Sequence, residues 1–259
     1  MHVPSTPDDV PDRCVPDDHS RQVNVEHLVR HLKEGGFHFD TVIDLGCGEG
    51  NSVDFFRALA PHAKWVGVDI ADSSEVALRK RADAEFRTYD GIHIPAEDSS
   101  VDLVFCRQVF EHVRHPEPLL RQVHRVLRPG GHLVLSASFL EPFHSRSIFG
   151  YTPYGFHLLL ETAGLDLVEL RPGVDGLTLM IRRLLGCPRF MDRWITGESP
   201  VNRIISAYAR LRGWPHRHTN RKKLLICGHF CLSARKPVQA GSDEEPGPAQ
   251  SSESRTYHP

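Results

Sequence analysis

Short apolar runs alternate with amphipathic segments between residues 41 and 171 of this chain. Between the runs, apolar residues recur with a helical period, as at Val53, Phe56 and Leu59. Strands that read as continuous apolar runs are buried on both faces, and intervening helices imply parallel pairing through right-handed crossovers. The pattern therefore predicts an α/β fold: an open, doubly wound, mostly parallel seven-stranded sheet of the Rossmann-like kind, with helices on both faces. The runs predict strands at 41–45, 65–70, 84–89, 101–106, 132–138 and 165–171.

The regular alternation stops after the sixth predicted strand. Residues 174–223 have a helical and irregular pattern, and the apolar run 224–234 predicts the seventh strand. Residues 1–21 and 236–259 are rich in proline and polar residues, so we expect a disordered N-terminal segment and a disordered tail. One domain, residues 22–235, remains, with 174–223 as an insertion before its last strand.

The charge of the chain is close to balanced as a whole but not locally. The 259 residues carry a net charge of −2, which argues against a general electrostatic binder of nucleic acid. The insertion 174–223 holds eleven lysines and arginines against three acids, a net charge of +8. Three interpretations stay open: a lid over a substrate site, a contact with an anionic membrane or a lipid-linked or phosphorylated substrate, and a nucleic-acid contact.

Composition bounds the environment of the protein. Apolar residues make up 40 % of the chain, enough for a substantial core, and no run reaches the roughly 18–20 residues of a membrane span. The N-terminus lacks the apolar core of a secretory signal, and six scattered cysteines are typical of reduced thiols, so we expect a cytoplasmic protein. Cys227 and Cys231 in "CGHFC" form too small a set to predict a metal site, and we expect none.

The run "VIDLGCGEG", residues 42–50, carries the main chemical signal. A strand that ends in glycines and opens a helix lets a ligand approach the backbone at the carboxyl edge of the sheet. The dinucleotide fingerprint needs a third glycine at position 51, which is Asn51, and the Gly-Lys-Ser/Thr of a phosphate loop is absent. The spacing G-x-G-x-G behind Asp44 therefore favours another ligand.

Four motifs in order resemble the class I S-adenosylmethionine-dependent methyltransferases, in particular the type 11 group of small-molecule methyltransferases. "VIDLGCGEG" and "VGVDI" resemble the first two motifs, and residues 89–138 resemble those that follow, so the resemblance covers about 40–171. The resemblance implies that S-adenosylmethionine is the cofactor. It assigns the cofactor site to Asp44, Gly46, Cys47, Gly48, Gly50, Asp69, Ile70, Asp90, Gly91, Ile92, Arg107 and Gln108.

The resemblance also implies a role for each part of that site. The glycine loop passes the methionine part and the ribose, with Asp44 near the ammonium group. Asp69 accepts the ribose hydroxyls, and Asp90 accepts the adenine amino group, with Ile70, Gly91 and Ile92 beside the ring. Arg107 and Gln108 lie near the cofactor's carboxylate and reactive methyl. The structural alternative for each aspartate is a helix cap or a turn.

Methyl transfer to an oxygen usually needs a general base. The candidates are His112, His144 and Glu141, and a structural role stays open for both histidines. Phe143, Phe149 and Tyr151 either line an acceptor pocket or belong to the core.

The sequence thus predicts a methyltransferase that acts on a small molecule, most simply at a hydroxyl of an anionic, sugar-containing or lipid-linked acceptor. The alternative is a non-catalytic module that binds the cofactor and holds a partner or a membrane through the insertion. The Asn/Asp-Pro-Pro-aromatic run common in base-modifying methyltransferases is absent, since residues 106–112 read "CRQVFEH", and this disfavours nucleic acid.

Overall fold

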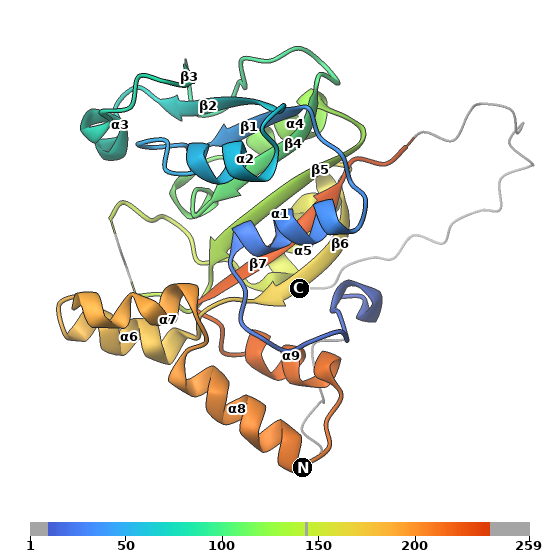
Figure 1. Ribbon diagram of the computed structural model, residues 1–259, viewed down its shortest axis with the longest axis vertical. Coiled ribbons are helices and arrows are strands. Elements are labelled where there is room, and N and C mark those ends of the chain that lie inside the picture. The colour runs from blue at the N-terminus through green and yellow to red at the C-terminus, as the bar shows by residue number, and fades with distance from the viewer. Residues whose placement is uncertain (1–9, 143–144, 239–259) are drawn as a thin grey trace, which may run out of the picture.

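The computed structural model describes residues 10–142 and 145–238 and contains one seven-stranded sheet (Figure 1). The strand order is β3-β2-β1-β4-β5-β7-β6. Strands β1 to β5 pair in parallel, and β7 is antiparallel to both of its neighbours. The predicted doubly wound, mostly parallel sheet is therefore confirmed. The strands are β1 Thr41–Leu45, β2 Lys64–Ile70, β3 Glu85–Tyr89, β4 Val101–Arg107, β5 Leu127–Ser138, β6 Asp166–Pro172 and β7 His229–Arg235.

Helices cover both faces of this sheet and define two layers of core. Leu119 and Phe156 anchor α4 and α5 in one apolar cluster, and Leu28 and Phe56 anchor α1 and α2 in the other. Helix α4 begins at Pro116 as predicted, because proline fits the first helical position, where no backbone donor is needed. These helices are α1 Val25–Glu34, α2 Val53–Leu59, α3 Ser74–Leu78, α4 Pro116–Val126 and α5 Pro153–Thr162.

The insertion 174–223 folds into four α-helices and a short 3-10 helix, Arg189–Met191, and the α-helices lie together beyond the β5–β7–β6 end of the sheet (Figure 1). Asp175 caps the first of them, since its carboxylate accepts a hydrogen bond from the Thr178 N–H at 2.7 Å. Part of the predicted last strand belongs here instead. The run 224–228 ends a helix and turns, and Gly228 N–H donates to Val174 O at 2.7 Å, because a short apolar run does not distinguish a buried helix end from a strand. The helices are α6 Gly176–Leu184, α7 Arg193–Thr196, α8 Pro200–Leu211 and α9 His216–Leu224.

The expectation of disorder over residues 1–21 is wrong for residues 10–21. A short 3-10 helix, Asp12–Cys14, lies against β6, and Val10, Cys14 and Val15 are buried. The acids that suggested disorder are ion-pair partners of basic residues elsewhere, as between Asp12 and Arg221. Residues 1–9 and 239–259 lie outside the described residues, so the disorder predicted there stays a prediction.

Candidate cofactor and acceptor site

The glycine loop after β1 needs its glycines. Gly46, Gly48 and Gly50 have φ of +73°, +50° and +82°, a region that L side chains rarely adopt. A Cβ at Gly46 would also lie 2.3 Å from Cγ2 of Val109, which follows β4. The loop is therefore held between the ends of β1 and β4, where the strand order places β1 between β2 and β4 and a ligand crevice is expected.

Asp69, near the end of β2, shapes this loop. Its Oδ2 accepts a hydrogen bond from Gly48 N–H at 2.7 Å, and its Oδ1 accepts one from Ile70 N–H at 2.8 Å. The residue is only 9 % exposed, and this burial raises the pKa of its carboxyl. Asp69, the residue predicted to bind the ribose, thus lies directly against the predicted loop. Each of its carboxylate oxygens keeps a further lone pair that can accept a hydrogen bond from a ligand.

Asp44 lies deeper than Asp69. It accepts a hydrogen bond from the Ser52 hydroxyl, which in turn accepts one from Trp65 Nε1 at 3.0 Å. Burial raises the pKa of Asp44 to about 7. Cys47 beside it is also buried, and burial raises the pKa of its thiol to about 12, so it is no nucleophile at neutral pH.

Asp90 follows β3, which pairs with β2, so it lies at the same sheet edge as Asp69. Its Oδ1 accepts hydrogen bonds from the N–H groups of Ile92 and His93, and its Oδ2 lies 2.6 Å from His93 Nδ1. The hydrogen bonds to the His93 side chain and to these two amides hold the pKa of Asp90 below its usual range. Asp90 therefore has the hydrogen bonds of a turn residue, the structural role considered for it from the sequence. Its contact with adenine stays a prediction.

Gly91 and Ile70 form an open apolar surface beside that turn. A Cβ at Gly91 would meet only Ile70 Cγ2, at 3.9 Å, and the Ile70 side chain is 36 % exposed. The predicted contact of these residues with the adenine ring stays a prediction.

Arg107 is the last residue of β4 and Gln108 follows it, and the two side chains have different partners. Arg107 is exposed and pairs with Glu26 of α1 at 2.8 Å, a contact that the sequence pattern does not reveal. Gln108 has φ of +54°, and its Oε1 accepts a hydrogen bond from the Ser138 hydroxyl at 2.8 Å. Its Nε2 is buried and has no hydrogen-bond partner among the described residues. A strained residue with a buried free donor is typical of a ligand site.

A buried polar cluster continues from Gln108 along the ends of β5 and β7. The Ser138 hydroxyl is also 2.7 Å from Glu141 Oε2, which lies 2.6 Å from His229 Nε2. Glu111 is fully buried, with its Oε1 3.2 Å from the Ser138 hydroxyl, and burial raises the pKa of its carboxyl. Ser138 and His229 face one another across the β5–β7 pair, so only strand pairing brings them together.

The three predicted general bases fall in different places. Glu141 joins the cluster. His112 ends the 3-10 helix Phe110–His112 and interacts electrostatically with Glu111 and with Glu75 of α3. His144 lies outside the described residues, as does Phe143.

The aromatic residues of the predicted acceptor pocket divide between two environments. Tyr151 is buried against Phe156 and donates a hydrogen bond to Phe110 O at 3.1 Å, so it belongs to the core. Phe149 is 41 % exposed and remains available to a ligand.

Helix α3 covers the glycine loop. Arg79, which follows α3, donates through Nε to Gly48 O at 2.7 Å and lies over the Phe86 ring. A Cβ on Gly48 would be only 3.0 Å from Glu75 Cβ. A ligand that contacts the loop at Gly48 therefore meets these side chains of α3 and its C-terminal cap.

Comparison with known proteins agrees with this geometry. Residues 43–135 match the protein family described as "Methyltransferase domain". A Mycolicibacterium smegmatis protein named "Probable S-adenosylmethionine-dependent methyltransferase" is 30 % identical over 140 residues, 49 % of this chain and 52 % of that protein. Malonyl-acyl-carrier-protein O-methyltransferase of Methylococcus capsulatus is 29 % identical over 198 residues, 66 % of this chain and 72 % of that protein. The chain spans about half the length or less of most curated relatives that it matches.

Solved structures share the fold. The 4+2 cyclase SpnF superposes with a TM-score of 0.56 at 16 % identity, over 87 % of this chain and 88 % of that chain. At this identity the likeness concerns the fold and not the reaction.

Proposed function

Residues 43–135 are a class I S-adenosylmethionine-dependent methyltransferase domain of the type 11 group, and from that premise we propose that the chain methylates a hydroxyl of a small molecule. The observation that carries the proposal is a partly buried polar cluster at the sheet edge that holds the glycine loop. In it the single Ser138 proton is shared between the acceptors Gln108 Oε1 and Glu141 Oε2, and Glu141 Oε2 also contacts His229 Nε2. Similarity to an enzyme named an O-methyltransferase supports the choice of oxygen.

The residues around the loop fit a cofactor with a sulfonium, an ammonium, a ribose diol and a flat base. Asp69 would hold the ribose hydroxyls, and Ile70 with Gly91 would carry the adenine ring. The free Nε2 of Gln108 would donate to the methionine carboxylate, which satisfies a donor that otherwise has no partner among the described residues. When bound, the cofactor supplies an electrophilic methyl group.

Glu141 and His229 would act as the base. An acceptor oxygen that takes the methyl group which the cofactor would supply must lose its own proton. The hydroxyl proton passes to the hydrogen-bonded pair of Glu141 and His229, which Ser138 orients. The pair is largely buried, so water is kept from the reacting atoms.

Turnover is tested by release of S-adenosylhomocysteine from the full chain supplied with labelled cofactor and pools of hydroxyl-bearing metabolites. We expect Glu141→Gln to lower kcat by roughly 10²–10⁴-fold, the usual range for a lost general base. Calorimetry should show its affinity for S-adenosylhomocysteine within about twofold of wild type. Glu117→Gln, on the exposed first turn of α4, is the matched control and should leave kcat unchanged. An unchanged kcat in Glu141→Gln would contradict the assignment of the base.

A second candidate is a module that binds the cofactor without methyl transfer. An enzyme named for a cyclisation has the same fold, so the fold by itself does not require methyl transfer. Tight binding of S-adenosylhomocysteine together with no methyl transfer to any pool would support it.

We also propose a cytoplasmic location. All six cysteines are free, and five of them are buried, which suits a reducing compartment. No helix within the described residues has the length and apolar character needed to cross a membrane.

A further inference from the structure

Two helices of the insertion expose apolar stripes. Leu177, Met180, Ile181 and Leu184 of α6 follow the spacing i, i+3, i+4, i+7, and each is at least 42 % exposed. Ile204, Tyr208 and Leu211 of α8 follow the spacing i, i+4, i+7 and are at least 50 % exposed. Such spacing normally marks the face of a helix that packs on a core, so an exposed stripe indicates a binding surface. We call these seven residues the outer stripes.

The outer stripes are not the faces by which α6 and α8 pack on the rest of the protein. The opposite side of each helix is already buried, at Leu179 on α6 and at Asn202 on α8. A buried network holds this side: Gln22 Oε1 accepts hydrogen bonds from Asn202 Nδ2 at 2.8 Å and from Ser199 N–H at 3.1 Å. The Ser199 hydroxyl donates in turn to Asp175. The helices are therefore fixed with their stripes outward.

The lysines and arginines of the insertion differ in whether they have an ion-pair partner. On α9, Arg221 pairs with Asp12, and Lys223 pairs with Glu198 at 2.6 Å. Within residues 10–142 and 145–238, no ion pair is found for a second group, on α8 and its cap and at or just before α7. This group is Arg189, Arg193, Arg203, Arg210 and Arg212. Arg217 and Lys222 of α9 likewise have no ion pair among the described residues, but these five arginines lie on or next to the helices that carry the outer stripes.

The acids of the insertion do not offset that second group. Asp192 pairs with Arg182 at 2.7 Å, and Asp175 is buried in its own hydrogen bonds. With Glu198 bound to Lys223, all three acids are engaged. The surface around the outer stripes is therefore both apolar and cationic.

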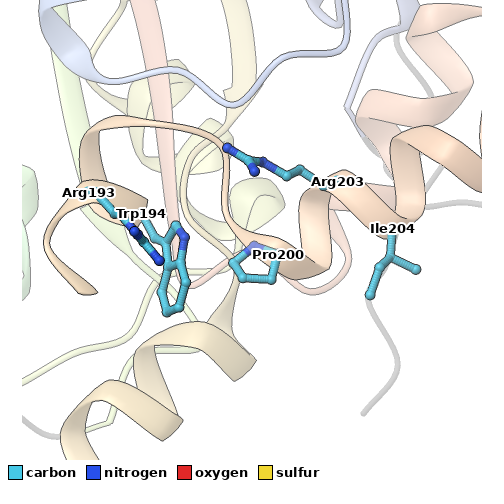
Figure 2. A pocket seen from close by; sticks show the side chains of 5 residues that line it. All are labelled: Arg193, Trp194, Pro200, Arg203 and Ile204. Carbon is cyan, nitrogen blue, oxygen red and sulfur yellow. The ribbon is translucent and has the colours of Figure 1, made fainter. Parts of the chain in front are cut away.

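A pocket of about 540 Å³ opens in this surface between α7 and α8. Figure 2 shows Arg193 and Trp194 on the α7 side, and Pro200, Arg203 and Ile204 on α8, with the Arg203 side chain extending toward α7. The Arg193 guanidinium carbon lies 5.0 Å from the Trp194 ring centre. A pocket lined by two arginines together with aromatic and aliphatic side chains suits a phosphate that carries an apolar chain.

We propose that α6, α7 and α8 dock on an anionic lipid bilayer, with the outer stripes in its interfacial region and a lipid phosphate between Arg193 and Arg203. Amphipathic helices with cationic flanks bind membranes in this way, because basic residues near the surface attract anionic headgroups while the apolar face enters the interface. A second copy of the chain fits less well, because a two-fold contact would set unpaired arginines against one another. Nucleic acid would leave the apolar stripes in water.

The test is co-sedimentation of the full chain with vesicles. Vesicles of phosphatidylcholine with 30 % phosphatidylglycerol should bind the protein at about 0.1 M salt, and vesicles of phosphatidylcholine alone should not. Arg193→Gln with Arg203→Gln should weaken binding about tenfold or more, by two charges near the surface. Leu184→Ser with Leu211→Ser should weaken it to a similar degree, since both side chains are 85 % exposed. Lys80→Gln with Arg114→Gln, exposed cations outside the insertion, is the matched control and should bind like wild type.

Calorimetry with S-adenosylhomocysteine keeps this test separate from the proposed reaction, because each variant should bind it as wild type does if the fold is intact. Absence of binding to anionic vesicles at low salt would overturn the docking proposal. So would binding of the Arg193→Gln, Arg203→Gln double variant equal to that of wild type, or a wild-type dimer that Leu184→Ser with Leu211→Ser converts to a monomer.

Discussion

At the scale of single residues, three aspartates at strand ends of one sheet have three different environments. Asp44 and Asp69 are buried, and burial raises the pKa of each, while Asp90 is exposed and its hydrogen bonds lower its pKa. The residue type is the same, so the surroundings of each carboxyl, above all its burial and its hydrogen-bond donors, set the direction of its pKa shift. The predicted roles of Asp44 and Asp69 can thus be tested separately.

Asp69→Asn should weaken binding of S-adenosylhomocysteine by about 1–3 kcal/mol, the scale of a lost hydrogen bond to a polar group. The amide oxygen can still accept from Gly48 N–H, so the loop should keep its shape while the ribose loses one acceptor. Isothermal calorimetry measures the change, and Asp72→Asn, on the exposed turn after β2, is the control. An affinity equal to wild type would remove the ribose role.

Asp44→Asn should change how stability depends on pH. The carboxyl has an ordinary pKa of 3.8 and a folded pKa of about 7, so between these values the folded state holds a proton that the unfolded state has released. Stability from this group therefore falls as pH rises through that window, by up to about 4 kcal/mol. Urea unfolding at pH 4 to 8 should show Asp44→Asn gaining stability relative to wild type across the window. Parallel curves for the two proteins would contradict the raised pKa.

At the scale of elements, α3 differs from every helix that packs on the sheet. None of its five residues is buried, and Arg79 at its end binds Gly48 O. A short helix without buried side chains has little to hold it closed. It is therefore the element expected to move when the cofactor reaches the loop.

Hydrogen exchange should show this motion directly. Amides of residues 74–79 should exchange rapidly in the free protein. With saturating S-adenosylhomocysteine their exchange should be slower by about tenfold or more, because contacts with the ligand would hold α3 in place. Amides of α4, whose apolar face is fully buried, provide the reference and should stay slow in both states. Strong protection of residues 74–79 without ligand would show that α3 is no gate.

At the scale of the whole molecule, some charged residues are held in ion pairs and others have no ion-pair partner among the described residues. The acidic N-terminal segment binds basic residues distant in sequence, as Asp18 does with the buried Arg171 at 2.7 Å. Five arginines of the insertion without an ion pair among the described residues lie on α7 and α8 and in the segments that flank them, next to the apolar stripes. A near-neutral chain thus presents one strongly cationic, apolar surface beyond the sheet end where the acceptor cluster lies, with Arg183 of α6 3.8 Å from Glu141.

The sequence by itself determined the sheet and the glycine loop. Local patterns encode both, since strand burial, helix caps and positive φ at glycine depend on neighbours within a few residues. Only the tertiary structure decided that Ser138, Glu141 and His229 form one hydrogen-bonded cluster, and that residues 10–21 pack rather than stay loose. Those outcomes depend on pairing between residues up to about two hundred positions apart, where burial and ion pairs override the local preference of a polar, proline-rich segment.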